Sequence, residues 1–146
     1  MIEGFVLNDE LIQIKKGSYS WPEAIEESSK PLVEHKYIND SYVEAMIKVV
    51  EEFGPYIVIA PNVAMPHARP EAGSKKVGFS VTVFEEEVIF DKDEDIKAKL
   101  FITLSCTTSD THIKMIQALV EILGNDELVE KLVNSNNKEE ILEIFR

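Results

Sequence analysis

The sequence predicts an α/β protein of one domain, with a mixed parallel and antiparallel sheet and helices packed on both faces of that sheet. A chain of 146 residues can bury one sizeable core and does not need a second domain, so residues 1–146 are expected to form one domain. Segments with strand-like alternation are interspersed with segments of helical periodicity. Residues 77–90 resemble an antiparallel hairpin, which would make the sheet mixed.

The first half of the chain predicts a strand followed by two helices. Residues 11–14 are expected to form a short strand. Ser20 is a suitable N-cap for a helix that begins at Trp21-Pro22 and ends near Pro31. A second helix is expected after a capping box of Ser41 and Glu44, and Gly54-Pro55 ends it. Its apolar stripe consists of Val43, Met46, Ile47 and Val50.

The middle of the chain is rich in strand signals. Residues 56–60 are apolar and β-branched, which predicts a buried strand, and a short strand over 63–65 follows a Pro-Asn turn. In the expected hairpin, the side chains of Val77, Phe79, Val81 and Val83 face one side and the polar residues 85–87 form the turn. A charged loop over 91–97 then leads to a central strand over 99–104.

The last third of the chain predicts three helices. Residues 107–111 are a dense cluster of capping residues, and a long amphipathic helix follows until Gly124-Asn125. Its apolar stripe is expected to consist of Ile113, Ile116, Val120 and Leu123. Two shorter helices are expected over residues 126–133 and 138–145.

Charge and composition exclude several classes of function. The net charge of −12 repels phosphate backbones, which argues against nucleic acid binding. No apolar run approaches the roughly 20 residues that span a bilayer, and Met1-Ile2-Glu3-Gly4 lacks the basic and apolar regions of a signal peptide. We therefore expect a cytoplasmic protein without membrane insertion. The single cysteine, Cys106, cannot form an internal disulfide, and we favour a buried small hydrophobe over a reactive thiol.

His67 lies in the segment that best suits catalysis. Pro66 and Pro70 fix the backbone on either side of it, so the loop should hold the imidazole at a defined angle. A neutral imidazole is a competent nucleophile, and the guanidinium of Arg69, two residues on, can bind phosphoryl oxygens. A turn histidine beside a solvated arginine remains equally compatible with the spacing.

The other two histidines differ in context. His112 is expected in the first turn of the long helix, where free N–H groups and the helix dipole bind anions. It can support an anion held there, or it can simply occupy a helix start. His35 lies between two helices with no polar cluster beside it, so we expect a surface residue.

Two motifs resemble a known family. The string Ile59-Ala60-Pro61-Asn62-Val63-Ala64-Met65-Pro66-His67-Ala68-Arg69-Pro70 is similar to the active-site segment of the mannitol/fructose-type enzyme IIA components of the bacterial sugar phosphotransferase system. The run from Pro66 to Glu71, preceded by residues 54–58, most resembles the ascorbate branch. Thr111-His112-Ile113-Lys114 resembles the segment with the family's second histidine. The likeness extends over essentially the whole chain.

The resemblance implies a specific activity. His67 would accept a phosphoryl group from the phosphocarrier protein HPr and pass it to a cysteine of an enzyme IIB component. The sugar, of the ascorbate or mannitol/fructose class, would then be phosphorylated as it crosses the membrane through the IIC component. His112 would support the phosphorylated state. No Gly-rich nucleotide loop is present, so a kinase that uses ATP directly is not expected and no cofactor is implied.

One departure and two alternatives stay open. Mannitol-type members have an arginine late in the helix before the active-site segment, whereas residues 50–53 here are Val-Glu-Glu-Phe; either Arg69 takes over its role or this branch lacks it. A regulatory IIA-like phosphoprotein would have the same site, and only the neighbouring genes would distinguish it from a transport component. A metal site of His67, His112 and Asp110 is the third hypothesis, although the sequence has no closely spaced ligand pair.

Overall fold

The computed structural model describes residues 7–145, so the expectation about a signal peptide at residues 1–4 lies outside the described residues. The elements follow in the order η1 (Asp9–Leu11), β1 (Ile12–Lys15), α1 (Trp21–Glu34), α2 (Asp40–Phe53), β2 (Val58–Ala60), β3 (Asn62–Ala64), η2 (Pro70–Ala72), β4 (Gly78–Asp91), β5 (Ile96–Ser105), α3 (Ser109–Leu123), α4 (Asp126–Val133) and α5 (Lys138–Phe145). The predicted mixture of strands and helices is confirmed.

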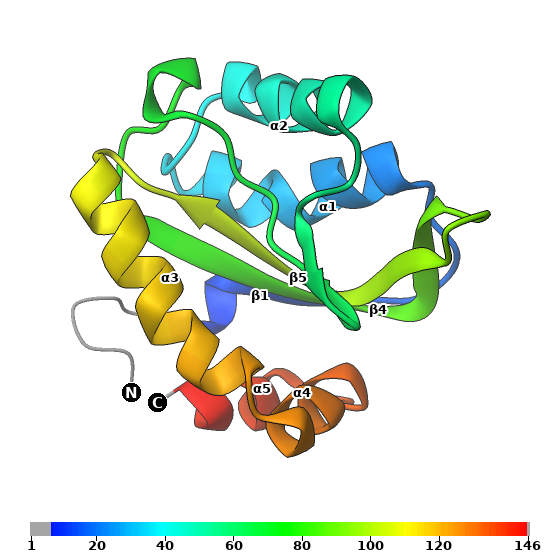
Figure 1. Cartoon of the computed structure of the whole chain (residues 1–146). Helices are drawn as coiled ribbons and strands as arrows, with labels where there is room; N and C mark the ends of the chain where they lie inside the picture. Colours follow the sequence, from blue (N-terminus) through cyan, green and yellow to red (C-terminus); the bar gives the residue numbers. More distant parts are fainter. Residues whose placement is uncertain (1–6, 146) are drawn as a thin grey trace.

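The strands form one five-stranded sheet in the order β1-β4-β5-β3-β2. β1 runs parallel to β4 and β3 runs parallel to β5, while the β4–β5 and β2–β3 pairs are antiparallel. The sheet is therefore mixed, as the sequence predicts. Figure 1 shows α1 and α2 on one side of it and α3, α4 and α5 on the other.

Each face of the sheet has its own apolar core. On one face, side chains of α1 and α2 such as Ile25 and Met46 pack against Phe84 and Phe101 of the sheet. On the other face, α3, α4 and α5 cover strand residues. The strand residues in this second core include Phe79, Val81 and Val83, which the sequence places on one side. Alternate positions of a strand point to opposite faces, so these two cores follow directly from the alternation in β4 and β5.

The expected hairpin within residues 77–90 is wrong. β4 is one continuous strand from Gly78 to Asp91, and the hairpin partner is β5. The pairing passes from Val83 with Leu100 to Val88 with Ala98, which advances five residues along β4 and two along β5. The three glutamates between these pairs are exposed on a bulge. A polar run can therefore be a bulge in a long strand and need not be a turn.

The true turn between β4 and β5 is shorter than the predicted charged loop. The Oδ1 atom of Asp91 accepts hydrogen bonds from the N–H groups of Asp93 and Glu94, at 3.0 and 3.1 Å. This Asx turn reverses the chain at once, so that β5 already begins at Ile96.

Helix α1 continues past the proline at which the sequence predicts its end. Ser20 caps its N-terminus in a capping box with Glu23, and the helix extends to Glu34 with Pro31 inside it. A proline leaves the carbonyl four residues earlier without its helical donor, which here is the carbonyl of Glu27. The side-chain amide of Gln13 on β1 donates to that carbonyl at 2.7 Å. A long-range contact thus compensates for the proline.

Two further predictions about the first half are wrong. Ser41 forms no capping box with Glu44; its hydroxyl donates instead to the carbonyl of Ala72, at 2.7 Å, and ties η2 to the start of α2. The expected buried strand over 56–60 is the short edge strand β2, in which Ile59 is exposed. β2 is the last strand of the sheet and pairs on one side only.

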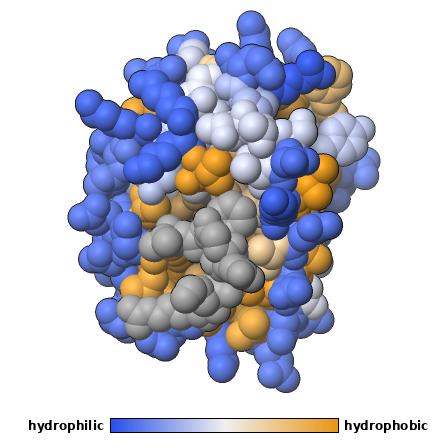
Figure 2. Space-filling model, turned by 90° about the vertical axis from the view of Figure 1, so that its left-hand side faces the viewer, coloured by the Kyte–Doolittle hydropathy of each residue, from blue (hydrophilic) through white to orange (hydrophobic). Residues whose placement is uncertain are grey.

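Helix α3 begins as predicted, but only part of its predicted apolar stripe is buried. Thr108 caps it in a capping box with Thr111. Its buried residues are Met115, Leu119 and Leu123, of which Leu123 belongs to the predicted stripe, whereas Ile113 and Val120 are 54% and 50% exposed. On the side of the molecule seen in Figure 2, apolar patches lie among hydrophilic side chains. Within residues 7–145, no helix is long and apolar enough to cross a membrane.

Candidate functional site

His67 lies on a segment that leaves the end of β3 and runs beside the end of β5. The N–H of Leu104 on β5 donates to the carbonyl of Pro66 at 3.0 Å, which anchors the segment directly before the histidine. The Nδ1 atom of His67 lies 2.7 Å from the carbonyl oxygen of Met65. Because a carbonyl can only accept, this contact places the proton on Nδ1 in the neutral ring and leaves Nε2 with its lone pair.

His112 meets His67 from the first turn of α3. The two ring centroids lie 5.1 Å apart, with an angle of 44° between the ring planes. Partial burial lowers the pKa of His112, and the neighbouring His67 lowers it further. The ring of His112 is therefore held in its neutral form more strongly than a free histidine, which leaves it a hydrogen-bond donor on one nitrogen and an acceptor on the other.

The two histidines line a pocket of about 530 Å³ together with Arg69. Arg69 is exposed, and none of the ion pairs found within residues 7–145 involves it. It is the only arginine in that part of the chain. Its guanidinium is thus available to an incoming anion.

The N-terminus of α3 forms another wall of this pocket. Thr108 and Ser109 line it, and the hydroxyl of Thr108 already accepts the N–H of Thr111. The N–H groups of Ser109 and Asp110 belong to the first turn, which has no acceptors within its own helix. Two histidines, one guanidinium and a helix N-terminus therefore meet around one space. Such a set suits a group with several anionic oxygens.

Comparison with known protein families identifies the kind of reaction that this anion-binding pocket supports. Residues 5–146 match the family described as "Phosphoenolpyruvate-dependent sugar phosphotransferase system, EIIA 2". The chain belongs to this family. It is an enzyme IIA component, and enzyme IIA components are phosphotransferases that act by phosphoryl transfer.

Individual relatives agree with this assignment. The chain is 40% identical to a mannitol-specific cryptic phosphotransferase enzyme IIA component of Escherichia coli, over 92% of this chain and 90% of that protein. It is 32% identical to an ascorbate-specific enzyme IIA component of E. coli, over 92% and 88% of the two chains. The mannitol enzyme IIA of E. coli, solved in complex with phosphorylated enzyme IIB, superposes with a TM-score of 0.85 at 28% identity and covers 97% of each chain.

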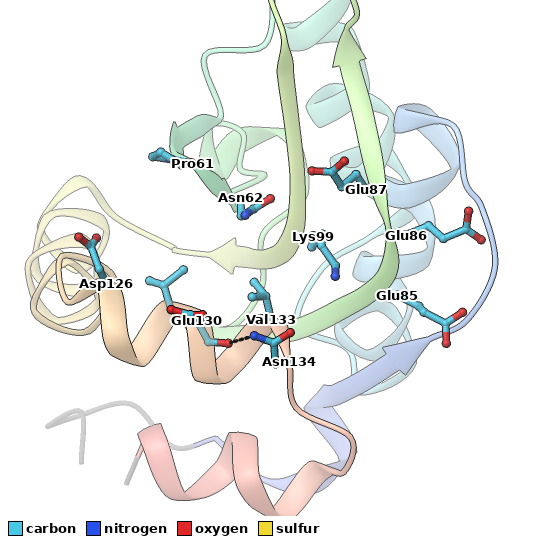
Figure 3. Close-up of a pocket in the computed structure, with 11 residues that line it drawn as sticks. Pro61, Asn62, Glu85, Glu86, Glu87, Lys99, Asp126, Glu130, Val133 and Asn134 are labelled. Carbon is cyan, nitrogen blue, oxygen red and sulfur yellow. Dashed lines mark hydrogen bonds between the residues drawn. The ribbon is translucent and has the colours of Figure 1, made fainter.

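A larger cleft of about 780 Å³ lies elsewhere on this enzyme IIA, beside the bulge of β4 and the helix α4. Five acidic side chains and one lysine, Lys99, line it. Figure 3 shows the carboxylates of Glu85, Glu86 and Glu87 on the strand and those of Asp126 and Glu130 on the helix. Such a concentration of negative charge repels a phosphoryl group. The histidine pocket, although smaller, is the better site for phosphoryl transfer.

Val49, Phe53 and Cys106 line the histidine pocket, and none of them is predicted there from the sequence. Val49 and Phe53 of α2 form an apolar wall on the helix where mannitol-type members have their arginine. Their spacing of four residues places them on one side of the helix, and this pattern is detectable in the sequence. Cys106 also lines the pocket, but it is 4% exposed, and burial raises its pKa to about 11. It behaves as the buried hydrophobe that we favour from the sequence.

His35 and Asp110, the other two residues considered in the sequence analysis, do not line the histidine pocket. Nε2 of His35 lies 3.4 Å from a carboxylate oxygen of Glu10, at the end of α1 and away from the pocket. Within residues 7–145, no group of three or more histidine, cysteine or acidic side chains is arranged to hold a metal ion. Asp110 is exposed and does not line the pocket, so the hypothetical set of His67, His112 and Asp110 finds no support.

Proposed function

We propose that His67 is the residue of this enzyme IIA that becomes phosphorylated, and that Nε2 is the acceptor atom. The observation that carries the proposal is the 2.7 Å contact between Nδ1 and the carbonyl of Met65, which leaves Nε2 unprotonated. The lone pair of Nε2 attacks phosphorus as the bond between phosphorus and the donor breaks. The proton on Nδ1 stays in place, so uptake needs no proton transfer.

Positive groups around His67 then hold the phosphoryl oxygens. Arg69 offers a fork of N–H donors from the rim of the pocket, and the N–H groups at the start of α3 offer a second set. Phosphoryl transfer depends chiefly on alignment and on stabilisation of the equatorial oxygens. His112, whose ring centroid lies 5.1 Å from that of His67, donates a hydrogen bond to the phosphoryl group and does not itself become phosphorylated.

The donor and acceptor are proteins. We infer from the family resemblance that phosphorylated HPr supplies the group in the cytoplasm. We infer further that a cysteine of an enzyme IIB component receives it, and the E. coli mannitol relative solved with its phosphorylated enzyme IIB supports an enzyme IIB partner. The apolar side chains of Phe53 and Ile113 lie exposed at the pocket and suit a protein surface that must come close to His67. The transported sugar would belong to the mannitol/fructose or ascorbate class; the names of two relatives contain mannitol and ascorbate.

A reconstituted phosphorylation assay tests this proposal. Incubation with phosphoenolpyruvate, enzyme I and HPr should add one phosphoryl group, stable to base and labile to acid, as phosphohistidine is. His67→Ala should take up none, whereas His35→Ala, a matched histidine loss away from the pocket, should be phosphorylated like the wild type. Undiminished uptake by His67→Ala would overturn the assignment.

A further inference from the structure

The hydroxyl of Tyr42 makes unusual contacts for a core residue. Tyr42 belongs to α2, and its side chain is 1% exposed. Its hydroxyl donates to the carbonyl of Leu104 on β5, at 2.8 Å, and accepts the N–H of Ala68 at 3.1 Å. A longer contact of 3.3 Å to the carbonyl of Ala68 competes for the same proton. One buried phenol thus connects α2, the end of β5 and Ala68, the residue that follows His67.

His67 lies between two anchors to the same residue of β5. On its N-terminal side, the carbonyl of Pro66 accepts the N–H of Leu104. On its C-terminal side, the N–H of Ala68 reaches the carbonyl of Leu104 through the hydroxyl of Tyr42. The first anchor is a direct backbone contact, whereas the second exists only because of one hydroxyl group.

Leu104 is also close in sequence to the start of α3, which forms another wall of the pocket. β5 ends at Ser105, Cys106 follows, and the N-cap of α3 is Thr108, four residues after Leu104. A group that fixes Ala68 against Leu104 therefore fixes the segment of His67 relative to the start of α3 and to His112. The reacting atom and the groups that hold phosphoryl oxygens come from these two segments.

We propose that Tyr42 is a positioning residue for phosphoryl transfer, and that its hydroxyl sets the geometry between His67 and the N-terminus of α3. The inference rests on the proposed role of His67. The hydroxyl touches neither the phosphoryl group nor the imidazole; it acts through the backbone of Ala68 and Leu104. A small displacement of a nucleophile from its alignment lowers transfer rates strongly, so the effect is expected on the rate of transfer at saturating donor.

The hydroxyl keeps its role across the range in which histidines titrate. Burial raises the pKa of Tyr42 to about 12, so the phenol stays protonated and continues to donate to Leu104. Tyr42→Phe removes only this oxygen and preserves the ring that packs in the core. Tyr19→Phe is the matched control, because Tyr19 packs edge-on against Phe84 on the same face of the sheet, away from the His67 segment.

The test compares these two variants with the wild type in single-turnover transfer from phosphorylated HPr. We expect Tyr42→Phe to remain phosphorylated at His67, with a maximal rate reduced about tenfold and a smaller change in the concentration of HPr at half-maximal rate. Tyr19→Phe should match the wild type. In ¹⁵N spectra of the ring nitrogens, Tyr42→Phe should shift the signals of His67 and Tyr19→Phe should not.

Other results would overturn the inference. If Tyr42→Phe lowers only the melting temperature, with unchanged rates and unchanged His67 signals, the hydroxyl is merely structural. If the variant does not fold, hydrogen exchange of the Ala68 amide in the wild type decides, since exchange as fast as in an exposed loop would refute the anchor and protection like that of β5 amides would support it. If the wild type itself takes up no phosphoryl group at His67, the proposed function fails first, and that result is separate.

Discussion

Removal of the Arg69 side chain should separate catalysis from stability. The guanidinium is exposed and has no ion-pair partner among the residues that the structure describes. Surface substitutions of this kind change the free energy of unfolding by less than about 0.5 kcal/mol. Arg69→Ala should therefore fold and melt like the wild type.

The rate of phosphoryl transfer should respond far more. A hydrogen bond to a charged group contributes about 1.5–3 kcal/mol when it is made, and each 1.36 kcal/mol corresponds to about tenfold in rate. Loss of one such contact in the transition state slows transfer by roughly 10- to 160-fold. Arg69 lies at the rim of the pocket, where solvent screens its charge, so we expect the lower end, about tenfold.

The assay is rapid-quench transfer from phosphorylated HPr, combined with thermal unfolding of the same preparations. Arg69→Lys keeps the charge without the planar fork and should fall between Arg69→Ala and the wild type. Lys114→Ala removes a cation from an exposed position on α3 that does not line the pocket, and it should leave the rate unchanged. Equal rates for Arg69→Ala and the wild type, with both HPr and enzyme IIB, would refute the role of the guanidinium.

Three further predictions concern the surroundings of the site. His112→Ala should still be phosphorylated on His67, with onward transfer to enzyme IIB impaired more than uptake; wild-type rates in both half-reactions would show that His112 only starts a helix. Burial and His67 lower the pKa of His112 in the folded protein. As the pH falls below about 6.5, His112 therefore takes up a proton more readily in the unfolded chain, which lowers the free energy of unfolding. Between pH 7.5 and 5.5 the wild type should thus lose more stability in urea than His112→Gln, and equal losses would contradict this. Gly73→Ala combines a φ of +138° with a Cβ only 2.7 Å from the Oγ of Ser41, whereas Gly17→Ala, at φ +92°, meets nothing within 4 Å. Gly73→Ala should be less stable than Gly17→Ala by about 1 kcal/mol or more, and equal urea midpoints would show that the η2 contact with α2 is unimportant.

Local signals in the sequence predict most of the fold. Ser20 caps α1 as expected, and the N-cap of α3, Thr108, lies within the expected cluster of capping residues. The alternation through Phe79, Val81 and Val83 identifies the face that packs on α3. The wrong prediction for the end of α1 has a long-range cause. Pro31 continues a helix because Gln13 satisfies the freed carbonyl of Glu27, and such compensation by a residue far away in sequence cannot be deduced from local pattern.

The apolar stripe of α3 illustrates the same limit in relation to function. Ile113 and Val120 fit a helical period, yet both are exposed, and Met115 and Leu119 are buried in their place. Periodicity predicts that an amphipathic helix forms, but the rotation of that helix about its axis depends on the sheet against which it packs. Ile113 instead borders the histidine pocket, where an exposed apolar side chain suits a partner surface.

The site itself is only partly visible in the sequence. The prolines around His67 and the cap cluster before His112 indicate two candidate residues, but a separation of 45 positions gives no distance between them. The fold supplies the ring separation of 5.1 Å. The contact that selects the tautomer of His67 involves the carbonyl of Met65, and the sequence contains no signal for it.

The most direct test of the central claim is ¹⁵N NMR of the ring nitrogens before and after phosphorylation. In the unmodified protein, His67 should show a protonated Nδ1 and a free Nε2, because Nδ1 lies 2.7 Å from the carbonyl of Met65. After incubation with phosphoenolpyruvate, enzyme I and HPr, the phosphorus coupling should appear on Nε2 of His67, while Nδ1 keeps its proton and His112 stays unmodified. A phosphoryl group on His112, or on Nδ1 of His67, would contradict the account.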